Sequence, residues 1–370
     1  MERKGCTSGK QKIERGRRKQ AIAFGDDEKP NCLLDEPHSS SGNCRWRCPG
    51  IPHSKMPPPM QTEIRTLNEN DLAAADQLFR LAFGTFFGLP DPLAFSGDAL
   101  WVSTRFQTEP AGVHGAFADD ELIGVSVATP LGTFGTFGPL VLHPRVWNQG
   151  IAKHLIAPAL DFLGQLGATR IGLFTFAHSL KHQALYRKFD FWPQSLTYVM
   201  TKPASLTDSL DPEVCFSELP ADRQAAFLAD ALQLTDLLAP GLDLTAQIRA
   251  VEHLRLGETI AFFDRKGLAA FAICHFGKGT EGGSSTCYIK FGATREGTAP
   301  PLERLVTMCQ SLCRRRGLAE TVAGASTAHP DTCRCLMAAG FRPEFVGVAM
   351  EKPHGSIYSR KNSHVLDDWR

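Results

Sequence analysis

Residues 136–192 constrain the fold of this 370-residue chain most, because they combine a strand, a polar turn and an amphipathic helix. The apolar run 140–142 ends at a His-Pro pair, and a polar turn leads to Gly150. Apolar residues then recur at helical spacing from 151 to 163. The turn therefore lies at a helix N-terminus, where free backbone N–H groups and the helix dipole attract an anion. Because Gly150 has no Cβ, a pyrophosphate would fit against its backbone.

This turn resembles the acetyl-CoA-binding motif of the GNAT N-acetyltransferases, V-x-P-x-x-R/Q-x-x-G-x-G/A. Leu142, Pro144, Gly150 and Ala152 match the motif, whereas Trp147 stands where Arg or Gln is typical. The departure weakens the side-chain contact with the pyrophosphate and leaves the backbone cradle intact. The resemblance implies that acetyl-CoA, as co-substrate, is bound by Leu140, Val141, Leu142, His143, Trp147, Asn148, Gln149, Gly150, Ile151, Ala152, Lys153 and Ser179.

Residues 179–191 resemble a second signature of the same family, N-x-x-A-x-x-x-Y-x-x-x-G-F. Tyr186 and Phe191 match it, and the departures are Ser179, His182 and Asp190. The resemblance implies that Tyr186 is the catalytic general acid, since a phenol can protonate a departing thiolate. A half-buried packing role for this tyrosine is the alternative.

Gly138-Pro139 predicts that the sheet opens inside the strand that begins at Phe134, because proline cannot donate a ladder hydrogen bond. In GNAT folds the pantetheine arm lies in such a gap, so residues 140–142 would form one wall and 170–177 the other. An ordinary bulge is the alternative reading.

The base that takes the proton of the amine is not identified. Residues 122–143 contain no Asp or Glu, where many family members keep one. His114, His143 and a water relay stay open as candidates. The acceptor pocket is expected from the loop-rich stretch 84–108 and from the second half of the chain.

A similar order of strands and helices returns after a linker at 203–212. We therefore expect an α/β (α+β) fold of two tandem GNAT-like domains, at 61–203 and 212–353, followed by a tail at 354–370. Each domain should be a mixed, mostly antiparallel twisted sheet flanked by helices.

The second copy resembles a GNAT domain without the cofactor motifs. Residues 295–301 lack the G-x-G/A cradle, and Leu336 takes the place of Tyr186. A leucine cannot donate a proton, so this copy is predicted to be non-catalytic and to shape the acceptor site or a homodimer interface.

Residues 1–60 are basic at their start and rich in Pro, Ser and Gly towards their end, which predicts a disordered extension. Two histidines and two cysteines in this stretch do not have the spacing of a zinc finger, and we predict no metal site: His38, Cys44, Cys48 and His53. The eleven cysteines of the chain are scattered, which argues against a disulfide framework.

The net charge of +1 argues against nucleic acid as the main partner. No apolar stretch reaches the roughly 18 residues that span a bilayer, so we expect a cytoplasmic protein without membrane contact. The preferred hypothesis is an N-acetyltransferase that passes an acetyl group directly from acetyl-CoA to a primary amine of a small molecule or peptide. Two alternatives stay open: a non-catalytic acyl-CoA-binding or sensing protein, and a nucleic-acid adaptor that uses the basic extension.

Overall fold

The computed structural model describes residues 61–204, 210–295, 300–355 and 364–370. The first half contains six strands, β1 (Glu63–Thr66), β2 (Val113–Ala118), β3 (Glu121–Leu131), β4 (Phe134–Leu142), β5 (Arg170–Phe176) and β6 (Trp192–Pro203). Its α-helices are α1 (Leu72–Phe86), α2 (Trp101–Thr108), α3 (Ala152–Gln165) and α4 (Leu180–Arg187). The extension at 1–60, predicted to be disordered, and its four candidate zinc ligands lie outside the described residues.

The second half repeats this order of elements, as the sequence predicts. Its strands are β7 (Val214–Cys215), β8 (Gly257–Asp264), β9 (Gly267–Gly277), β10 (Gly283–Thr294), β11 (Glu320–Ser326), β12 (Arg342–Lys352) and β13 (His364–Leu366). Its α-helices are α5 (Ala221–Leu238), α6 (Thr245–His253), α7 (Pro300–Arg315) and α8 (Pro330–Ala338). Five short 3-10 helices complete the described structure: Glu69–Asp71, Pro92–Ala94, Pro110–Gly112, Pro144–Val146 and Phe216–Glu218.

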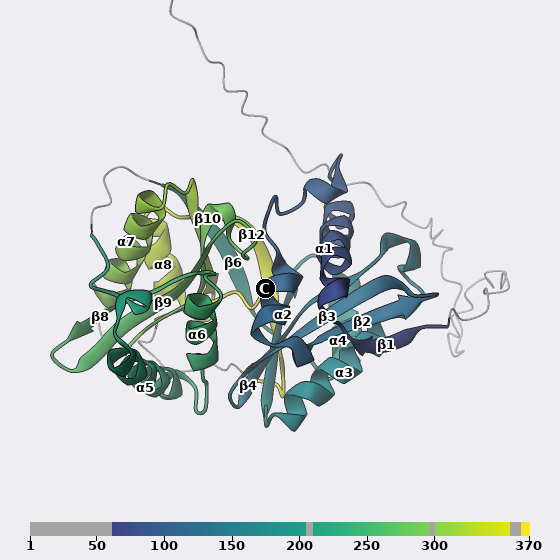
Figure 1. Ribbon diagram of the computed structural model, residues 1–370, viewed down its shortest axis with the longest axis horizontal. Helices are drawn as coiled ribbons and strands as arrows, with labels where there is room; N and C mark the ends of the chain where they lie inside the picture. Colours follow the sequence, from purple (N-terminus) through teal and green to yellow (C-terminus); the bar gives the residue numbers. More distant parts are fainter. Residues whose placement is uncertain (1–60, 205–209, 296–299, 356–363) are drawn as a thin grey trace, which may run out of the picture. The chain divides into compact units, whose positions relative to one another are not determined.

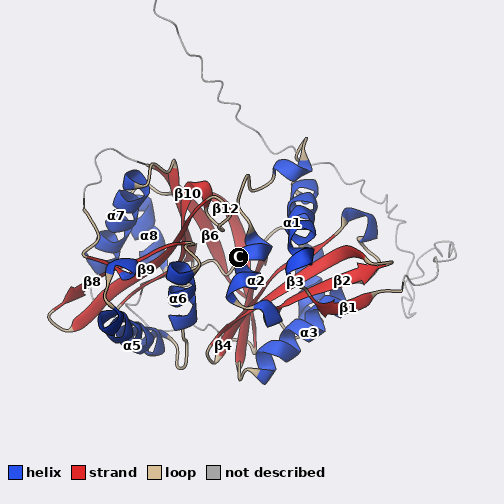
Figure 2. Cartoon of the chain, in the orientation of Figure 1, coloured by secondary structure: helices blue, strands red, loops and turns tan. Residues whose placement is uncertain are grey.

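The two halves share one sheet of 13 strands. The strands lie in the order β1-β2-β3-β4-β5-β12-β6-β11-β10-β9-β8-β7, and β13 pairs with β10 off this path. Most neighbours are antiparallel, and the parallel pairs are β4 with β5 and β10 with β11. Helices cover both faces of the sheet (Figure 2). This is the mixed, mostly antiparallel α/β architecture that the sequence predicts.

The final strands of the two halves are exchanged. β12 of the second half pairs with β5 of the first, while β6 of the first half pairs with β11 of the second. β6 and β12 pair with each other at the centre of the sheet, where Figure 1 shows the teal and the yellow strand side by side. Each half therefore completes the sheet of the other.

Successive side chains of strand β3 point to opposite faces of the sheet, and helices of the first half pack against both faces. Val125 and Val127 join the apolar core under α1 and α2, whereas Ser126 and Ala128 face α3. Helix α3 buries Leu155, Ile156, Ala159 and Leu163, which recur at helical spacing. The packing fixes the start of α3 beside the end of β4.

The sheet opens between β4 and β5. Their parallel pairing runs only from Phe134 opposite Arg170 to Thr136 opposite Gly172, although both strands continue. On its other side β4 shifts register against β3 between Leu140 and Phe137, which marks a bulge at Gly138-Pro139. The predicted opening is confirmed. We call the space between residues 137–142 and 173–176 the strand gap.

The described residues contain no helix that is both long enough and apolar enough to cross a membrane. In the same part of the chain, no cluster of three or more His, Cys, Asp or Glu side chains could hold a metal ion. The seven cysteines that the structure describes are free thiols, and six of them are buried.

Candidate active site

The backbone of β4 presents two amides to the strand gap. The N–H of His143 donates to the carbonyl of Ile123 on β3 at 2.8 Å. Because successive residues of an antiparallel strand alternate in direction, the amide of Val141 also faces β3. The N–H groups of Leu140 and Leu142 therefore face the gap. Of the strand residues 140–143 expected to bind acetyl-CoA, Val141 and His143 thus direct their amides to β3 and not to the gap.

Two glycines leave open space at the gap and at the turn that follows it. A Cβ added to Gly138, whose φ is +141°, would meet no heavy atom within 4 Å. A Cβ added to Gly150, whose φ is +79°, would approach only the side chain of Lys153, at 3.8 Å. The backbone at both positions is thus accessible to a bound molecule.

The N-terminus of α3 offers free donors beside Gly150. Ile151 is the N-cap, is buried, and makes no side-chain capping hydrogen bond, and the first turn holds no acidic residue. Ala152 and Lys153 begin the helix. A lysine in a first turn opposes the helix dipole unless an anion lies nearby. The turn therefore fits the pyrophosphate that the motif implies.

The rest of the turn is tied down by its own side chains. The indole Nε1 of Trp147 donates to the carbonyl of Leu142 at 2.9 Å, so this side chain folds back onto β4. The Oδ1 of Asn148 accepts from Lys181 of α4 at 2.5 Å, and the Nε2 of Gln149 donates to the carbonyl of Arg145 at 3.2 Å. Trp147 thus stabilises the turn, and Lys181 brings a second cation to it through Asn148.

Tyr186 lies on α4 beside the start of the gap. Its ring contacts Phe137 and Phe191, with centroid separations of 6.2 and 6.4 Å, and the residue is 8% exposed. Burial raises the pKa of Tyr186, which keeps the phenol protonated. Among the described residues its hydroxyl has no hydrogen-bond partner, yet it is not among the fully enclosed polar atoms. This is a buried ring with an available proton donor.

One turn before Tyr186, His182 lies in an aromatic wall that sequence analysis missed. Its ring centroid is 5.4 Å from that of Phe86 and 6.0 Å from that of Phe176, and those two phenyl rings stack at 4.6 Å. Burial, followed by repulsion from Lys181, lowers the pKa of His182. The family signature has alanine at the position of His182, and this difference is the sequence signal that could have singled out the histidine. Ser179, the N-cap of α4, makes no side-chain capping bond.

Neither histidine proposed as a base meets Tyr186. The Nδ1 of His143 accepts from the backbone N–H of Arg145 at 3.2 Å, and this bond caps the short helix at 144–146. His114 lies on β2, separated from β4 by β3, with its ring 6.5 Å from Phe162 of α3. The described geometry therefore leaves the base unassigned.

In the second half, the chain itself occupies the matching opening. The strands β10 and β11 pair only from Thr286 opposite Glu320 to Ile289 opposite Ala323. Beyond that point β10 pairs with β13, and the N–H of Asp367 donates to the carbonyl of Gly324 on β11 at 3.2 Å. A segment inside the predicted tail 354–370 therefore fills the gap of the second half.

Comparison with known proteins agrees with this geometry. Residues 75–191 match the model of the Acetyltransferase (GNAT) family. This segment therefore resembles a GNAT acetyltransferase domain. It spans the opened sheet, the turn at Gly150 and Tyr186, and GNAT acetyltransferases use acetyl-CoA as the acyl donor. No curated protein matches the chain.

Solved structures resemble the whole described fold. An acetyltransferase candidate from Pyrococcus horikoshii has a TM-score of 0.58 at 16% identity and covers 84% of this chain and 94% of its own. A GCN5-related N-acetyltransferase from Sphaerobacter thermophilus has a TM-score of 0.53 at 15% identity, with 81% and 98% covered. A tandem GNAT protein from the clavulanic acid biosynthesis pathway has a TM-score of 0.52 at 13% identity, with 80% and 100% covered. At these identities the likeness concerns the fold, including its tandem arrangement.

Proposed function

We propose that the GNAT domain transfers an acetyl group from acetyl-CoA to a primary amine of a small molecule or peptide. Both substrates would be bound together, and transfer would be direct. The observation that carries this proposal is the strand gap, in which the amides of Leu140 and Leu142 face the same space that the ring of Tyr186 borders. An open helix N-terminus lies at the far end of β4.

The binding residues follow from the free groups of the site. The N–H groups at the start of α3, with Gly150, Ala152, Lys153 and Lys181 around them, would hold the pyrophosphate. The amide of Leu142 would pair with the pantetheine arm, which leaves the amide of Leu140 for the acetyl group. Acetyl-CoA supplies an activated acetyl group when bound.

Transfer to a neutral amine forms a C–N bond and breaks a C–S bond. The nitrogen releases one proton to solvent, the departing sulfur takes up one proton from an acid, and that acid regains a proton from solvent. The phenol of Tyr186 would be this acid, because its raised pKa keeps it protonated and nothing else holds its hydroxyl in the described structure. The N–H of Leu140 would stabilise negative charge on the acetyl oxygen, as donors in an oxyanion hole do. The aromatic wall of Phe86, Phe176 and His182 would border the acceptor.

A single working site per chain is part of the proposal. The gap of the second half is occupied by β13, and Leu336 of α8 replaces the tyrosine. The second half would instead complete the sheet and the acceptor side of the first.

The test is a screen of primary amines with acetyl-CoA, in which released CoA is detected as free thiol and products by mass spectrometry. We expect acetylation of an amine that depends on the amine concentration. Binding of acetyl-CoA without turnover of any amine class would favour the sensing alternative.

A further inference from the structure

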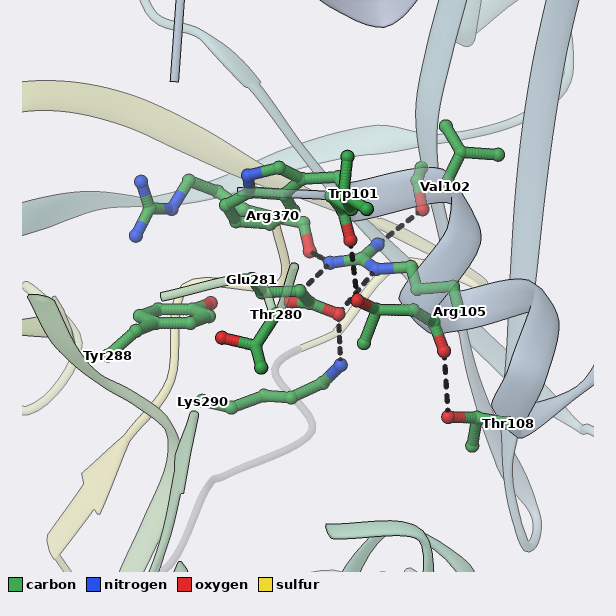
Figure 3. Close-up of polar contacts among 12 residues, drawn as sticks. Trp101, Val102, Arg105, Thr108, Thr280, Glu281, Tyr288, Lys290 and Arg370 are labelled. Carbon is green, nitrogen blue, oxygen red and sulfur yellow. Dashed lines mark hydrogen bonds and ion pairs between the residues drawn. The ribbon is translucent and has the colours of Figure 1, made fainter. Parts of the chain in front are cut away.

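A buried cluster of three charged side chains joins the two halves next to the bulge in β4. The Nε and Nη2 atoms of Arg105 on α2 contact the two carboxylate oxygens of Glu281 at 3.1 and 3.3 Å. Lys290 of β10 donates to the same carboxylate at 2.6 Å. Figure 3 shows the guanidinium and the ammonium groups directed at Glu281 from different elements. We call Arg105, Glu281 and Lys290 the charge cluster.

The cluster is largely enclosed, and its two cations share one carboxylate. The side chains of Arg105 and Glu281 are 5% and 0% exposed. Burial raises the pKa of Glu281, but attraction to Arg105 and Lys290 outweighs it and holds the pKa well below its usual range. A buried, bidentate pair of this kind fixes the guanidinium in one orientation.

The loop that carries Glu281 is anchored on the first half by backbone bonds. The N–H of Leu100 donates to the carbonyl of Thr280 at 3.1 Å, and the N–H of Gly279 donates to the carbonyl of Asp98 at 3.2 Å. These bonds seat the loop between β9 and β10 on the start of α2. The second half therefore sets the position of Arg105.

The remaining donor of Arg105 reaches the active site. Its Nη1 donates to the carbonyl of Gly138 at 2.6 Å, and its Nη2 also contacts the backbone carbonyl of Arg370. A side chain at position 138 would extend into open space, and the φ of Gly138 is one that only glycine adopts readily. Gly138 has no side chain that could hold its carbonyl in place, and the bond from Arg105 fixes the direction of that carbonyl.

We propose that Glu281 and Arg105 are positioning residues for acetyl transfer. Through Arg105, the second half holds the Gly138 carbonyl and so aims the N–H of Leu140, two residues later, into the strand gap. This inference rests on the proposed function. It gives the non-catalytic half a role in the chemistry of the other half.

The test uses Arg105→Lys, which keeps the charge beside Glu281 and removes the forked donor. The readout is the infrared stretch of the acetyl carbonyl in bound acetyl-CoA labelled with ¹³C at that carbon. In the unaltered protein we expect a shift to lower frequency, because the Leu140 amide polarises the carbonyl. In the variant we expect most of that shift to be lost, with the Kd of acetyl-CoA changed by less than about threefold, and kcat about 10- to 100-fold lower.

Arg65→Lys is the matched control. Arg65 also forms a bidentate pair with a carboxylate, that of Asp71, and donates to the carbonyl of Thr66, but it lies on the edge strand β1. In the Arg65→Lys variant, the shift of the acetyl carbonyl in bound acetyl-CoA and kcat should both equal those of the unaltered protein. Arg105→Met, which leaves Glu281 and Lys290 as a neutral pair, carries the test if Arg105→Lys does not fold.

A full carbonyl shift with kcat within about twofold of the unaltered protein, in either folded Arg105 variant, would overturn the inference and leave the proposed function intact. If the unaltered protein does not bind acetyl-CoA, the proposed function fails and the inference fails with it.

Discussion

Replacing Tyr186 with phenylalanine removes one hydroxyl and little else. The ring sits among Phe137 and Phe191, and those contacts are unchanged in the variant. The hydroxyl has no partner among the residues that the structure describes, so its removal leaves no buried polar group unpaired. We therefore expect a change in the free energy of unfolding of less than about 0.5 kcal/mol.

Catalysis should respond very differently. Loss of a positioned general acid typically lowers kcat by about 10²- to 10⁴-fold, which equals about 2.7–5.4 kcal/mol of transition-state stabilisation. The Kd of acetyl-CoA should stay within about threefold, because the hydroxyl acts on the departing sulfur and not on the pyrophosphate. Since burial raises the pKa of Tyr186, the acid stays protonated at neutral and mildly alkaline pH, and kcat of the unaltered enzyme should not fall there through loss of this proton.

The assay combines thermal unfolding, calorimetric titration with acetyl-CoA, and thiol release with the best amine. Tyr198→Phe on β6 is the matched control, and it should keep full activity. A Tyr186→Phe enzyme that folds and retains kcat within about threefold would refute the assignment of Tyr186 as the acid.

Two further predictions concern charge. Lys153→Glu places an acidic group at the N-terminus of α3, where the pyrophosphate would lie. In titration calorimetry we expect the affinity for acetyl-CoA to fall by about 5- to 30-fold at low salt and by less at high salt. Lys188→Glu, at the end of α4, is the control and should bind acetyl-CoA normally. Glu281 has a folded-state pKa below its unfolded value, so its stabilising contribution is present above about pH 4.3 and is lost as the pH falls through the folded pKa. Denaturant unfolding of Glu281→Gln should therefore show lower stability at pH 7 and a smaller loss of stability between pH 6 and pH 3 than the unaltered protein. If the free energy of unfolding fell equally between pH 6 and pH 3 in both proteins, Glu281 would not be ionised in the folded protein.

Local signals were sufficient to predict the elements around the site. At the start of the first helical region, Asn68 and Asp71 form a capping box, a short-range pattern that a sequence can indicate. The Gly138-Pro139 pair predicted where β4 leaves β5, because a proline there cannot continue the ladder. The turn at Gly150 was predicted from the change of periodicity between a strand and a helix.

Pairings between distant segments could not be predicted from sequence. Strands β6 and β12 have the same alternation of apolar and polar residues. That pattern does not say which neighbouring strand each one pairs with, so the sequence does not predict their exchange between the halves. The three residues of β13 are too few to be recognised as a strand. The glycine-rich stretch around Glu281 joins β9 to β10. The carboxylate of Glu281 meets Arg105 across 176 residues of chain, a contact that only tertiary structure decides.

The central claim is that the opened sheet beside Gly150 binds the diphosphate-bearing thioester. Calorimetric titration of the full chain with acetyl-CoA, repeated with Gly150→Val, tests it most directly. A valine at a φ of +79° is strained, and its side chain extends towards Lys153 where the anion would lie. We predict one binding site per chain in the unaltered protein, and binding at least about tenfold weaker in a folded Gly150→Val variant. No binding at millimolar acetyl-CoA, or equal binding by the two proteins, would contradict the account.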